Sequence, residues 1–462
     1  MSQFLNNMHR ARAHITAAGV LALITALAPA MALAATPAEA QQLKSTLTPF
    51  GAEKAGNKDG TIPAWTSGLT TPTPGFVNGG KRPDPFAAEK PLFSITAKNM
   101  GEHADKLSDG VKAMFNRYPE TYRLDVYPTH RTAAAPQWVY DATYRNATQA
   151  KIAEGAAGPY PEGASGGIPF PIPKTGVEVV WNHNLRWRPT SFVIDGQGYT
   201  VSADGRKTQF VDYSIDYLLP YYKVEDAAKK FSGDYVTVRV LYNGPPIRAG
   251  EGIVARFGLS EDDSAWVYLT GQRRVRKLPN ACCDTPNPAA AGVQGFDDVE
   301  VFIGRTDRFD WKLVGKKELF IPYNSNRSMA VPADALLGAH HLNPDHVRWE
   351  LHRVWVVEAT RRAGQRHQVA RSLYYFDEDT WMAVLGDRWD DKGSLWKSNW
   401  LLPMVMPDVP AVISSGFGGY DLNANLYMAT SLANDKRSQY RTAPVPSDKV
   451  FTPDGLINAS VR

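Results

Sequence analysis

The chain has 462 residues, of which 43% are hydrophobic and 21% are charged, and this balance excludes an intrinsically disordered protein. Its 51 basic and 47 acidic residues leave a formal net charge of +4, too small to predict nucleic acid as a partner. The 33 Pro and 37 Gly predict many turns and long loops rather than a helical bundle. The 12 Trp and 20 Tyr fit either a large β core or an aromatic-lined pocket.

The first 34 residues have the pattern of a cleavable secretion signal. Arg10 and Arg12 give a positive start, residues 15–28 are apolar, and Ala32 to Ala34 supplies small residues for cleavage. The apolar run is shorter than the roughly 20 residues that cross a bilayer, and no Cys follows the cleavage site to carry a lipid. We therefore predict a signal peptide over residues 1–34 and a periplasmic mature protein, with association to the outer membrane left open.

The segment 35–170 is predicted to contain helices and an extended arm. Thr36 and Glu39 form the N-cap and its partner in a capping box, which predicts that a short helix begins there. Residues 48–91 are rich in Gly and Pro and are expected to form an ordered, extended arm. Apolar residues at helical spacing predict one amphipathic helix over residues 99–118.

The clearest strand, residues 346–360, alternates between apolar and polar side chains. Its apolar positions are Val347, Trp349, Leu351, Trp355 and Val357, and its polar positions are Arg348, Glu350, His352 and Glu358. A period of two predicts that one face packs and the other is wet.

Residues 171–440 as a whole are predicted to form one sheet domain, followed by a C-terminal tail at 441–462. The strand at 346–360 continues into runs at 368–376 and 381–385 after short turns, which predicts an antiparallel meander. More than eight such runs occur, and an open sheet of that size must curl strongly. The predicted fold class is therefore β-rich (α+β): a curved antiparallel half-barrel sheet with a few helices covering its open side.

Five sequence blocks carry a resemblance to a known family. They are Leu47 to Asn57, Val180 to Arg186, Gly271 to Arg276, Asp307 to Lys317 and Arg353 to Ala359. Taken in order they resemble the DUF1329 family of exported proteobacterial proteins, over about residues 47–435. That family is distantly similar to LolA and LolB, periplasmic lipoprotein carriers whose half-barrel holds acyl chains. The resemblance implies a LolA-like half-barrel, a lipid ligand, and an inner-membrane exporter and an outer-membrane protein as partners.

None of the candidate catalytic or metal-binding motifs in the sequence has the structural context that its chemistry requires. Gly163 to Gly167 has the letters of a nucleophile elbow, but prolines flank it where a strand and a helix are required. The histidines His340, His341, His346 and His352 are expected to be solvated rather than to bind a metal. The acidic residues Asp297, Asp298, Glu300, Asp307 and Asp310 suit glycan hydrolysis only at a separation that a sequence does not reveal. We predict no catalytic residue, no metal and no cofactor.

The two cysteines, Cys282 and Cys283, are adjacent. A disulfide between neighbours would close a small strained ring, so we predict free thiols or an intermolecular bridge.

Aromatic strand residues are the predicted apolar wall of a ligand site. The predicted wall is Trp266, Tyr268, Trp311, Leu313, Trp349, Leu351 and Trp355. Arg273, Arg274 and Arg276 are candidates for binding an acidic head group, and pairing with acidic loops such as Asp297 and Asp298 is the alternative.

The exported, β-rich pattern and the resemblance together predict a periplasmic binding protein for a lipid or other hydrophobic ligand. Its predicted role is to assist outer-membrane lipid or lipoprotein traffic or export. Two alternatives stay open: an envelope hydrolase acting on glycan or lipid, and a structural adaptor of an export complex. An enclosed apolar pocket favours the binding protein, and paired buried carboxylates in a cleft favour the hydrolase. A flat exposed apolar patch favours the adaptor.

Overall fold

The computed structural model describes residues 34–223, 231, 233–278, 282–286 and 293–460. The predicted signal peptide, apart from Ala34, lies outside the described residues.

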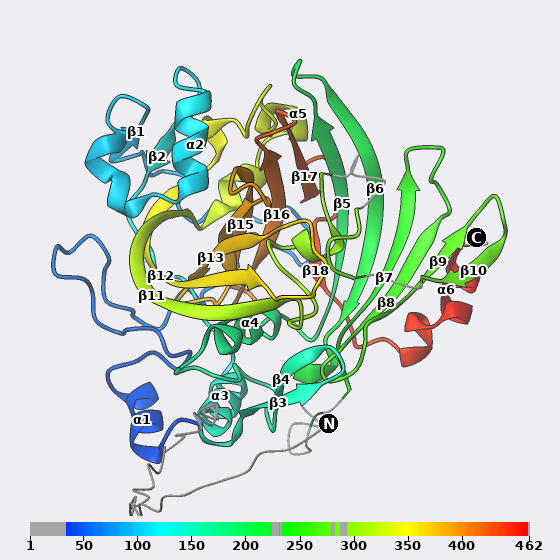
Figure 1. Ribbon diagram of the computed structural model, residues 1–462, viewed down its shortest axis with the longest axis horizontal. Coiled ribbons are helices and arrows are strands. Elements are labelled where there is room, and N and C mark those ends of the chain that lie inside the picture. Colours follow the sequence, from blue (N-terminus) through cyan, green and yellow to red (C-terminus); the bar gives the residue numbers. More distant parts are fainter. Residues whose placement is uncertain (1–33, 224–230, 232, 279–281, 287–292, 461–462) are drawn as a thin grey trace, which may run out of the picture. The chain divides into compact units, whose positions relative to one another are not determined.

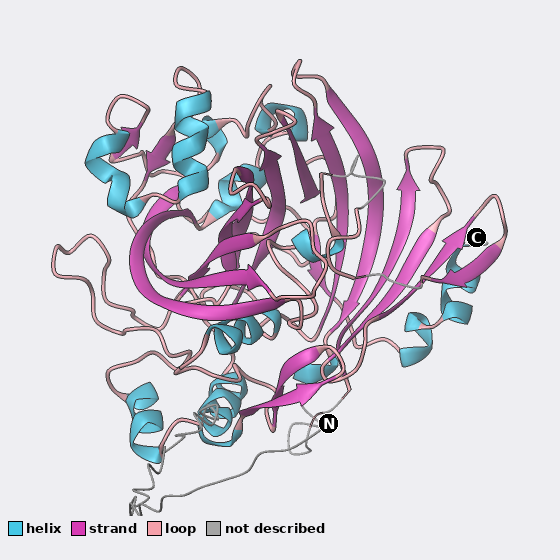
Figure 2. Ribbon diagram, viewed as in Figure 1, coloured by secondary structure: helices cyan, strands magenta, loops and turns pink. Residues whose placement is uncertain are grey.

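Strands dominate the described chain (Figures 1 and 2). They are β1 (Phe93–Ile95), β2 (Leu124–Val126), β3 (Lys151–Gly155), β4 (Gly158–Glu162), β5 (Ser191–Val201), β6 (Lys207–Leu218), β7 (Asp234–Gly244), β8 (Gly252–Gly258), β9 (Ser264–Leu269), β10 (Arg274–Lys277), β11 (Phe309–Pro322), β12 (Trp349–Arg361), β13 (Arg371–Asp377), β14 (Ala383–Trp389), β15 (Leu395–Met406), β16 (Ala411–Asp421), β17 (Leu426–Leu432) and β18 (Tyr440–Thr442). All but β3 and β4, which form a separate hairpin, belong to one 16-stranded sheet.

The large sheet consists of two meanders that meet side by side. Its hydrogen-bonded order is β1-β2-β12-β13-β14-β15-β16-β17-β5-β6-β7-β8-β9-β10, with β11 added on β12 and β18 on β5. Every pairing in it is antiparallel except the single bridge between β2 and β12. The meander β12 to β17 joins the meander β5 to β10 through β17 and β5. The sheet bends strongly and stays open (Figure 1), so the prediction of a curved, unclosed antiparallel sheet is confirmed.

The helices are short and lie around the sheet. They are α1 (Pro37–Gln41), α2 (Asp109–Arg117), α3 (Gln137–Gln149), α4 (Gly176–Asn184), α5 (Ala333–Leu336) and α6 (Pro453–Ser460). Short 3-10 helices occur at Gln42–Lys44, Met100–Lys106, Pro220–Tyr222, Phe296–Asp298, Ser325–Met329, Pro344–His346 and Asp448–Phe451. Helix α4 packs against β11 and β12, α2 against β14 and β15, and α6 against β7 to β10.

Two predicted helix starts can be compared with the structure. Thr36 caps α1 as expected, since its hydroxyl accepts from the Glu39 amide and the Glu39 carboxylate accepts from the Thr36 amide. The single helix predicted over residues 99–118 is instead a 3-10 segment followed by α2. The break occurs because the Ser108 hydroxyl accepts from the Val111 amide and so caps a new helix.

Three of the four residues on the predicted wet face of the 346–360 strand are buried, so the prediction is wrong for them, whereas Glu358 is half-buried. Arg348, Glu350 and His352 are 0%, 0% and 1% exposed. Segments distant in sequence cover them: Glu89 pairs with Arg348 at 2.7 Å, and the His130 amide donates to Glu350 at 2.8 Å. Alternation identifies two different faces, but it does not show that a second layer of chain covers the polar one.

Candidate ligand cavity

A cavity of about 200 Å³ lies against the inner face of the curved sheet. Alternate residues of two neighbouring strands build its main wall. They are Val211, Tyr213, Ile215 and Tyr217 of β6 and Val236, Val238, Val240 and Tyr242 of β7. Phe417 of β16 and Ser431 of β17 also line it, from the other side of β5. Because strands on both sides of β5 face one cavity, the sheet curves around it.

A second cavity of about 140 Å³ adjoins the first. Phe257, Val299 and Ile303 line both cavities, so the two share a wall. Ligand pockets commonly measure roughly 300–1,000 Å³, and the pair of cavities together falls at the lower end of that range. The side chains that line them are mostly apolar, which suits a chain-like hydrophobic ligand better than a polar one.

The loop of residues 293–304 supplies the remaining wall. Within it, Glu300 and Val301 adopt left-handed backbone conformations, with φ of 50° and 73°. A β-branched residue in this region is strained, so other contacts must hold the loop in place. The Val301 carbonyl accepts from Arg388 Nη2 at 2.7 Å, and the Glu300 carboxylate pairs with Arg186 and Arg188.

Buried charged residues form part of the wall of the first cavity. Arg188 and Glu300 both line it, and Arg186 lies beside them. Burial opposes the ionisation of Glu300, but Arg186 and Arg188 outweigh burial and lower its pKa to about 2. Burial also lowers the pKa of Arg186, and the charge of Arg188 adds to this effect while Glu300 opposes it. Two guanidinium groups therefore share one carboxylate.

Comparison with known proteins places the chain in a family. Residues 94–457 match the family described as "Protein of unknown function (DUF1329)". The chain belongs to the DUF1329 family. It is 38% identical over 454 residues to the "Uncharacterized protein PA3922" of Pseudomonas aeruginosa, covering 96% of this chain and 98% of that one.

The solved structures to which this chain is similar include two proteins of low sequence identity. One is a putative outer membrane lipoprotein-sorting protein domain from Vibrio parahaemolyticus, 11% identical with a TM-score of 0.43, covering 61% of this chain and 98% of that one. The other is the LolA superfamily protein NE2245 from Nitrosomonas europaea, 13% identical with a TM-score of 0.35, covering 61% of this chain and 100% of that one.

The seven predicted wall residues of this DUF1329 protein do not share one cavity. Trp266 and Tyr268 of β9 face α6 and pack near Leu456, while their neighbour Ala265 lines the second cavity. The side chains of adjacent strand residues point to opposite faces, so a one-residue change of register would exchange the two sets.

The predicted wall residues of β11 lie outside both cavities. Trp311 packs with ring centroids 5.1 Å from Phe302 and 5.9 Å from Tyr374, and its Nε1 donates to the Thr306 carbonyl at 2.9 Å. Leu313 is half-buried on the same strand. Both side chains belong to the packing beneath α4 rather than to the ligand cavity.

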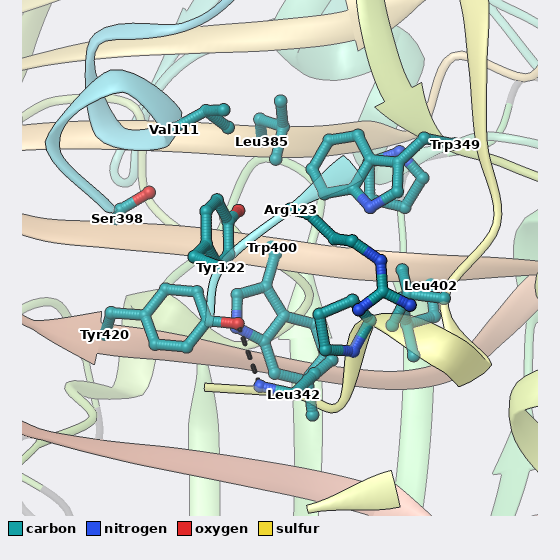
Figure 3. A pocket seen from close by; sticks show the side chains of 13 residues that line it. Val111, Tyr122, Arg123, Leu342, Trp349, Leu385, Ser398, Trp400, Leu402 and Tyr420 are labelled. Carbon is teal, nitrogen blue, oxygen red and sulfur yellow. Dashed lines mark hydrogen bonds between the residues drawn. The ribbon is translucent and has the colours of Figure 1, made fainter. Parts of the chain in front are cut away.

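The predicted wall residues of β12 point into the core. Leu351 is buried, and Trp355 stacks on Trp381 with ring centroids 6.3 Å apart. Trp349 lines a separate void of about 30 Å³ together with Trp400 and Tyr420 (Figure 3). A void of that size is about that of a single water molecule, so it does not hold a lipid chain.

The predicted head-group residues Arg273, Arg274 and Arg276 are exposed on and beside β10. Their alternative role, pairing with Asp297 and Asp298, is wrong. Burial, which raises the pKa of Asp298, is outweighed by Arg388 and Lys397, and that pKa falls to about 2. The Asp297 carboxylate contacts His367 Nε2 at 2.8 Å. Nearby buried side chains, and not the exposed arginines, thus contact Asp297 and Asp298.

A buried polar network beside β12 was not predicted from the sequence. Among the described residues, only His352, Asp377 and Asp379 bring three possible metal-ligand atoms within 4.8 Å of one another. Arg131 already neutralises Asp379 through two hydrogen bonds, and His352 Nε2 lies 3.0 Å from a Glu350 oxygen. These contacts describe an ion-pair network inside the fold. The predicted solvation is wrong for His352, which is 1% exposed, and for His341, which is 6% exposed.

The adjacent cysteines line the second cavity as free thiols. A hydrogen bond from Cys283 and the charges of Arg305 and Arg308 outweigh burial and lower the pKa of Cys282 to about 7. Burial raises the pKa of Asp263, which lines the same cavity, to about 7. A thiol with a lowered pKa therefore lies at the wall of the second cavity.

Two sequence patterns correspond to residues that line or adjoin the cavity. Val236, Val238 and Val240 alternate with period two, the pattern of a strand with one packed face. Arg186 and Arg188 stand two residues apart just after α4, at the end of one of the family's sequence blocks. Neither pattern predicts a cavity, because the cavity forms only where β6, β7 and the 293–304 loop come together.

No helix within the described part of the chain has the length and apolar character to span a bilayer.

Proposed function

We propose that this DUF1329 protein binds a lipid or other hydrophobic ligand in the periplasm and takes part in outer-membrane lipid or lipoprotein traffic. The observation that carries the proposal is the apolar cavity of about 200 Å³ between β6, β7 and the 293–304 loop, together with its neighbour of about 140 Å³. Well-packed proteins rarely contain voids larger than a water molecule. Apolar cavities of roughly 150 Å³ are known to take up small hydrophobic molecules.

The energetics allow useful affinity for a chain-like ligand. Burying about ten methylenes at roughly 0.8 kcal/mol each offers about 8 kcal/mol before the entropic cost of binding. Much of the chain must therefore be enclosed for micromolar binding. The lining valines provide this enclosure through side chains that are already ordered by the sheet.

The test is ligand uptake by the native protein and by a variant with a filled cavity. Native mass spectrometry of protein purified from the periplasm should show copurified amphiphile, and a fluorescent fatty acid should titrate with saturation. Val238 is buried and lines the cavity, so Val238→Phe occupies part of the space with additional apolar atoms and should weaken uptake. Val314 is 49% exposed on β11, so Val314→Phe is the matched control and should bind as the native protein does. Equal uptake by both variants would refute the proposed site.

The cellular location and the partners are part of the same proposal. We expect the mature chain to begin at Ala35, and N-terminal sequencing that finds residues 15–28 retained would contradict this. The family resemblance suggests an inner-membrane exporter and an outer-membrane protein as partners. Crosslinking in intact cells, with the Val238→Phe variant as comparison, would show whether these contacts depend on ligand.

A further inference from the structure

Arg188 is a buried cation at the wall of an apolar cavity. It is 3% exposed and follows α4 on the chain. Its Nη1 lies 3.3 Å from a Glu300 oxygen. Its Nε, also buried, has no hydrogen-bond partner among the described residues. A guanidinium carries five N–H donors, so Arg188 has donors beyond the one that Glu300 accepts.

The neighbouring groups do not balance this charge. Arg186 donates to the same Glu300 carboxylate and to the His183 carbonyl, the latter at 2.7 Å. Burial, together with the charge of Arg186, keeps the pKa of the His183 imidazole well below its usual value, so that ring is neutral and leaves the charge of the two arginines unchanged. One carboxylate therefore serves two cations inside the fold, and an unbalanced buried charge is unfavourable.

Three hydroxyl groups of the cavity wall already have hydrogen-bond partners. The Tyr213 hydroxyl lies 2.9 Å from Ser431 Oγ and 3.5 Å from Thr430 Oγ1. These hydroxyls are therefore weak candidates for a ligand's charged group. Arg188 is the wall group with both a formal charge and an unused donor.

We propose that the cavity takes an amphiphile with an anionic oxygen head group, which Arg188 binds while the apolar tail lies along Val236, Val238 and Val240. The inference rests on the proposed function and names its ligand class. The head group supplies the negative charge that the Arg186, Arg188 and Glu300 cluster lacks. Carboxylate and phosphate share the required chemistry, since a guanidinium binds either with two parallel hydrogen bonds.

The buried position of Arg188 distinguishes it from the exposed arginines of β10. Charge pairs at the surface contribute little because water and salt screen them. In a cavity of low dielectric the same pair is much stronger. Arg188 is therefore expected to select the head group, and Arg274 on the exposed hairpin is not.

The experiment is displacement of a fluorescent apolar probe by four ligands with the same tail: dodecanoate, dodecyl phosphate, dodecanol and dodecylamine. The native protein should bind one or both anions at least about tenfold more tightly than dodecanol, and dodecylamine most weakly. The first two ligands distinguish a carboxylate from a phosphate head group. Equal affinity for anion and alcohol would overturn the inference and leave the proposed function standing. Failure of all four ligands to bind would overturn the proposed function itself.

Variants separate a positioning effect from a direct contact. Arg188→Gln should reduce anion affinity about tenfold and leave dodecanol affinity unchanged. Glu300→Gln removes the competing carboxylate and should tighten anion binding. Arg206 is exposed in the turn between β5 and β6, so Arg206→Gln is the control for loss of one positive charge.

Two further results would overturn the inference. One is a loss of anion preference in Arg274→Gln, and the other is an equal loss of dodecanol and dodecanoate binding in Arg188→Gln. If Arg188→Gln does not fold, the ligand series measured on the native protein and on the Glu300→Gln variant still tests the preference for an anionic head group.

Discussion

Arg131 holds Asp379 through two parallel hydrogen bonds, from Nε to Oδ2 at 2.8 Å and from Nη2 to Oδ1 at 2.7 Å. Both side chains are 2% exposed. The pair links the segment that precedes α3 to the turn between β13 and β14. Arg131 also lies 3.5 Å from Glu378, so it faces two carboxylates at once.

We expect Arg131→Gln to lower the free energy of unfolding by about 3–5 kcal/mol, because removing one partner leaves a buried charge unpaired. Urea denaturation followed by tryptophan fluorescence measures this loss. The control is Arg362→Ala, whose partner Asp310 lies at 2.8 Å with side chains 39% and 71% exposed. An exposed pair contributes at most about 1 kcal/mol. Similar losses in the two variants would show that burial of the Arg131 pair has no energetic consequence.

Asp387 predicts a pH dependence of stability. Burial raises its pKa from 3.8 to about 6 in the folded protein. The folded state therefore holds a proton that the unfolded state loses, and the resulting stability is complete below pH 3.8 and lost as pH rises through about 6. A difference of roughly two pKa units corresponds to about 3 kcal/mol. Asp387→Asn should remove the contribution of this one group to the decline in unfolding free energy between these pH values, while Asp59→Asn at an exposed site should leave the native slope.

Gly110 allows α2 to approach the sheet closely. A Cβ at this position would lie 2.1 Å from Ser398 Oγ and 2.2 Å from Asp387 Oδ1. Helix propensity alone favours Ala by about 1 kcal/mol, but overpacking typically costs about 1–3 kcal/mol. We expect Gly110→Ala to lower the thermal midpoint. Gly101→Ala is the matched control because no atom lies within 4 Å of its added Cβ. An unchanged midpoint in Gly110→Ala would mean that α2 shifts without cost.

Cys282 is expected to react with electrophiles before Cys283. Its pKa is lowered to about 7, chiefly by the hydrogen bond from Cys283 and also by Arg305 and Arg308, and the thiolate is the reactive form. Iodoacetamide labelling followed by peptide mass spectrometry should therefore modify Cys282 first, with a rate that rises around pH 7. Cys283→Ser should shift that rise to higher pH. Preferential labelling of Cys283 would reverse the assignment.

The sequence alone was sufficient for features that depend on local or repeated patterns. The capping box of Thr36 and Glu39 and the meander after residue 346 were predicted correctly, because capping and strand alternation depend on neighbouring residues. The curvature of the sheet followed from the number of strand runs, since a long sheet of twisted strands cannot remain flat. The family also follows from the sequence, because the family model matches residues 94–457, a range that contains four of the five sequence blocks.

Only the tertiary structure decided which face of each strand meets the cavity. Tyr268 and Ala265 alternate on β9 as the pattern requires, yet α6, which is distant in sequence, covers the aromatic face and leaves the small side chain at the cavity. The buried charge of Arg188 likewise depends on Glu300, its carboxylate partner, which is 112 residues away along the chain. Periodicity describes one strand at a time, whereas burial and charge balance depend on which distant segments fold against it.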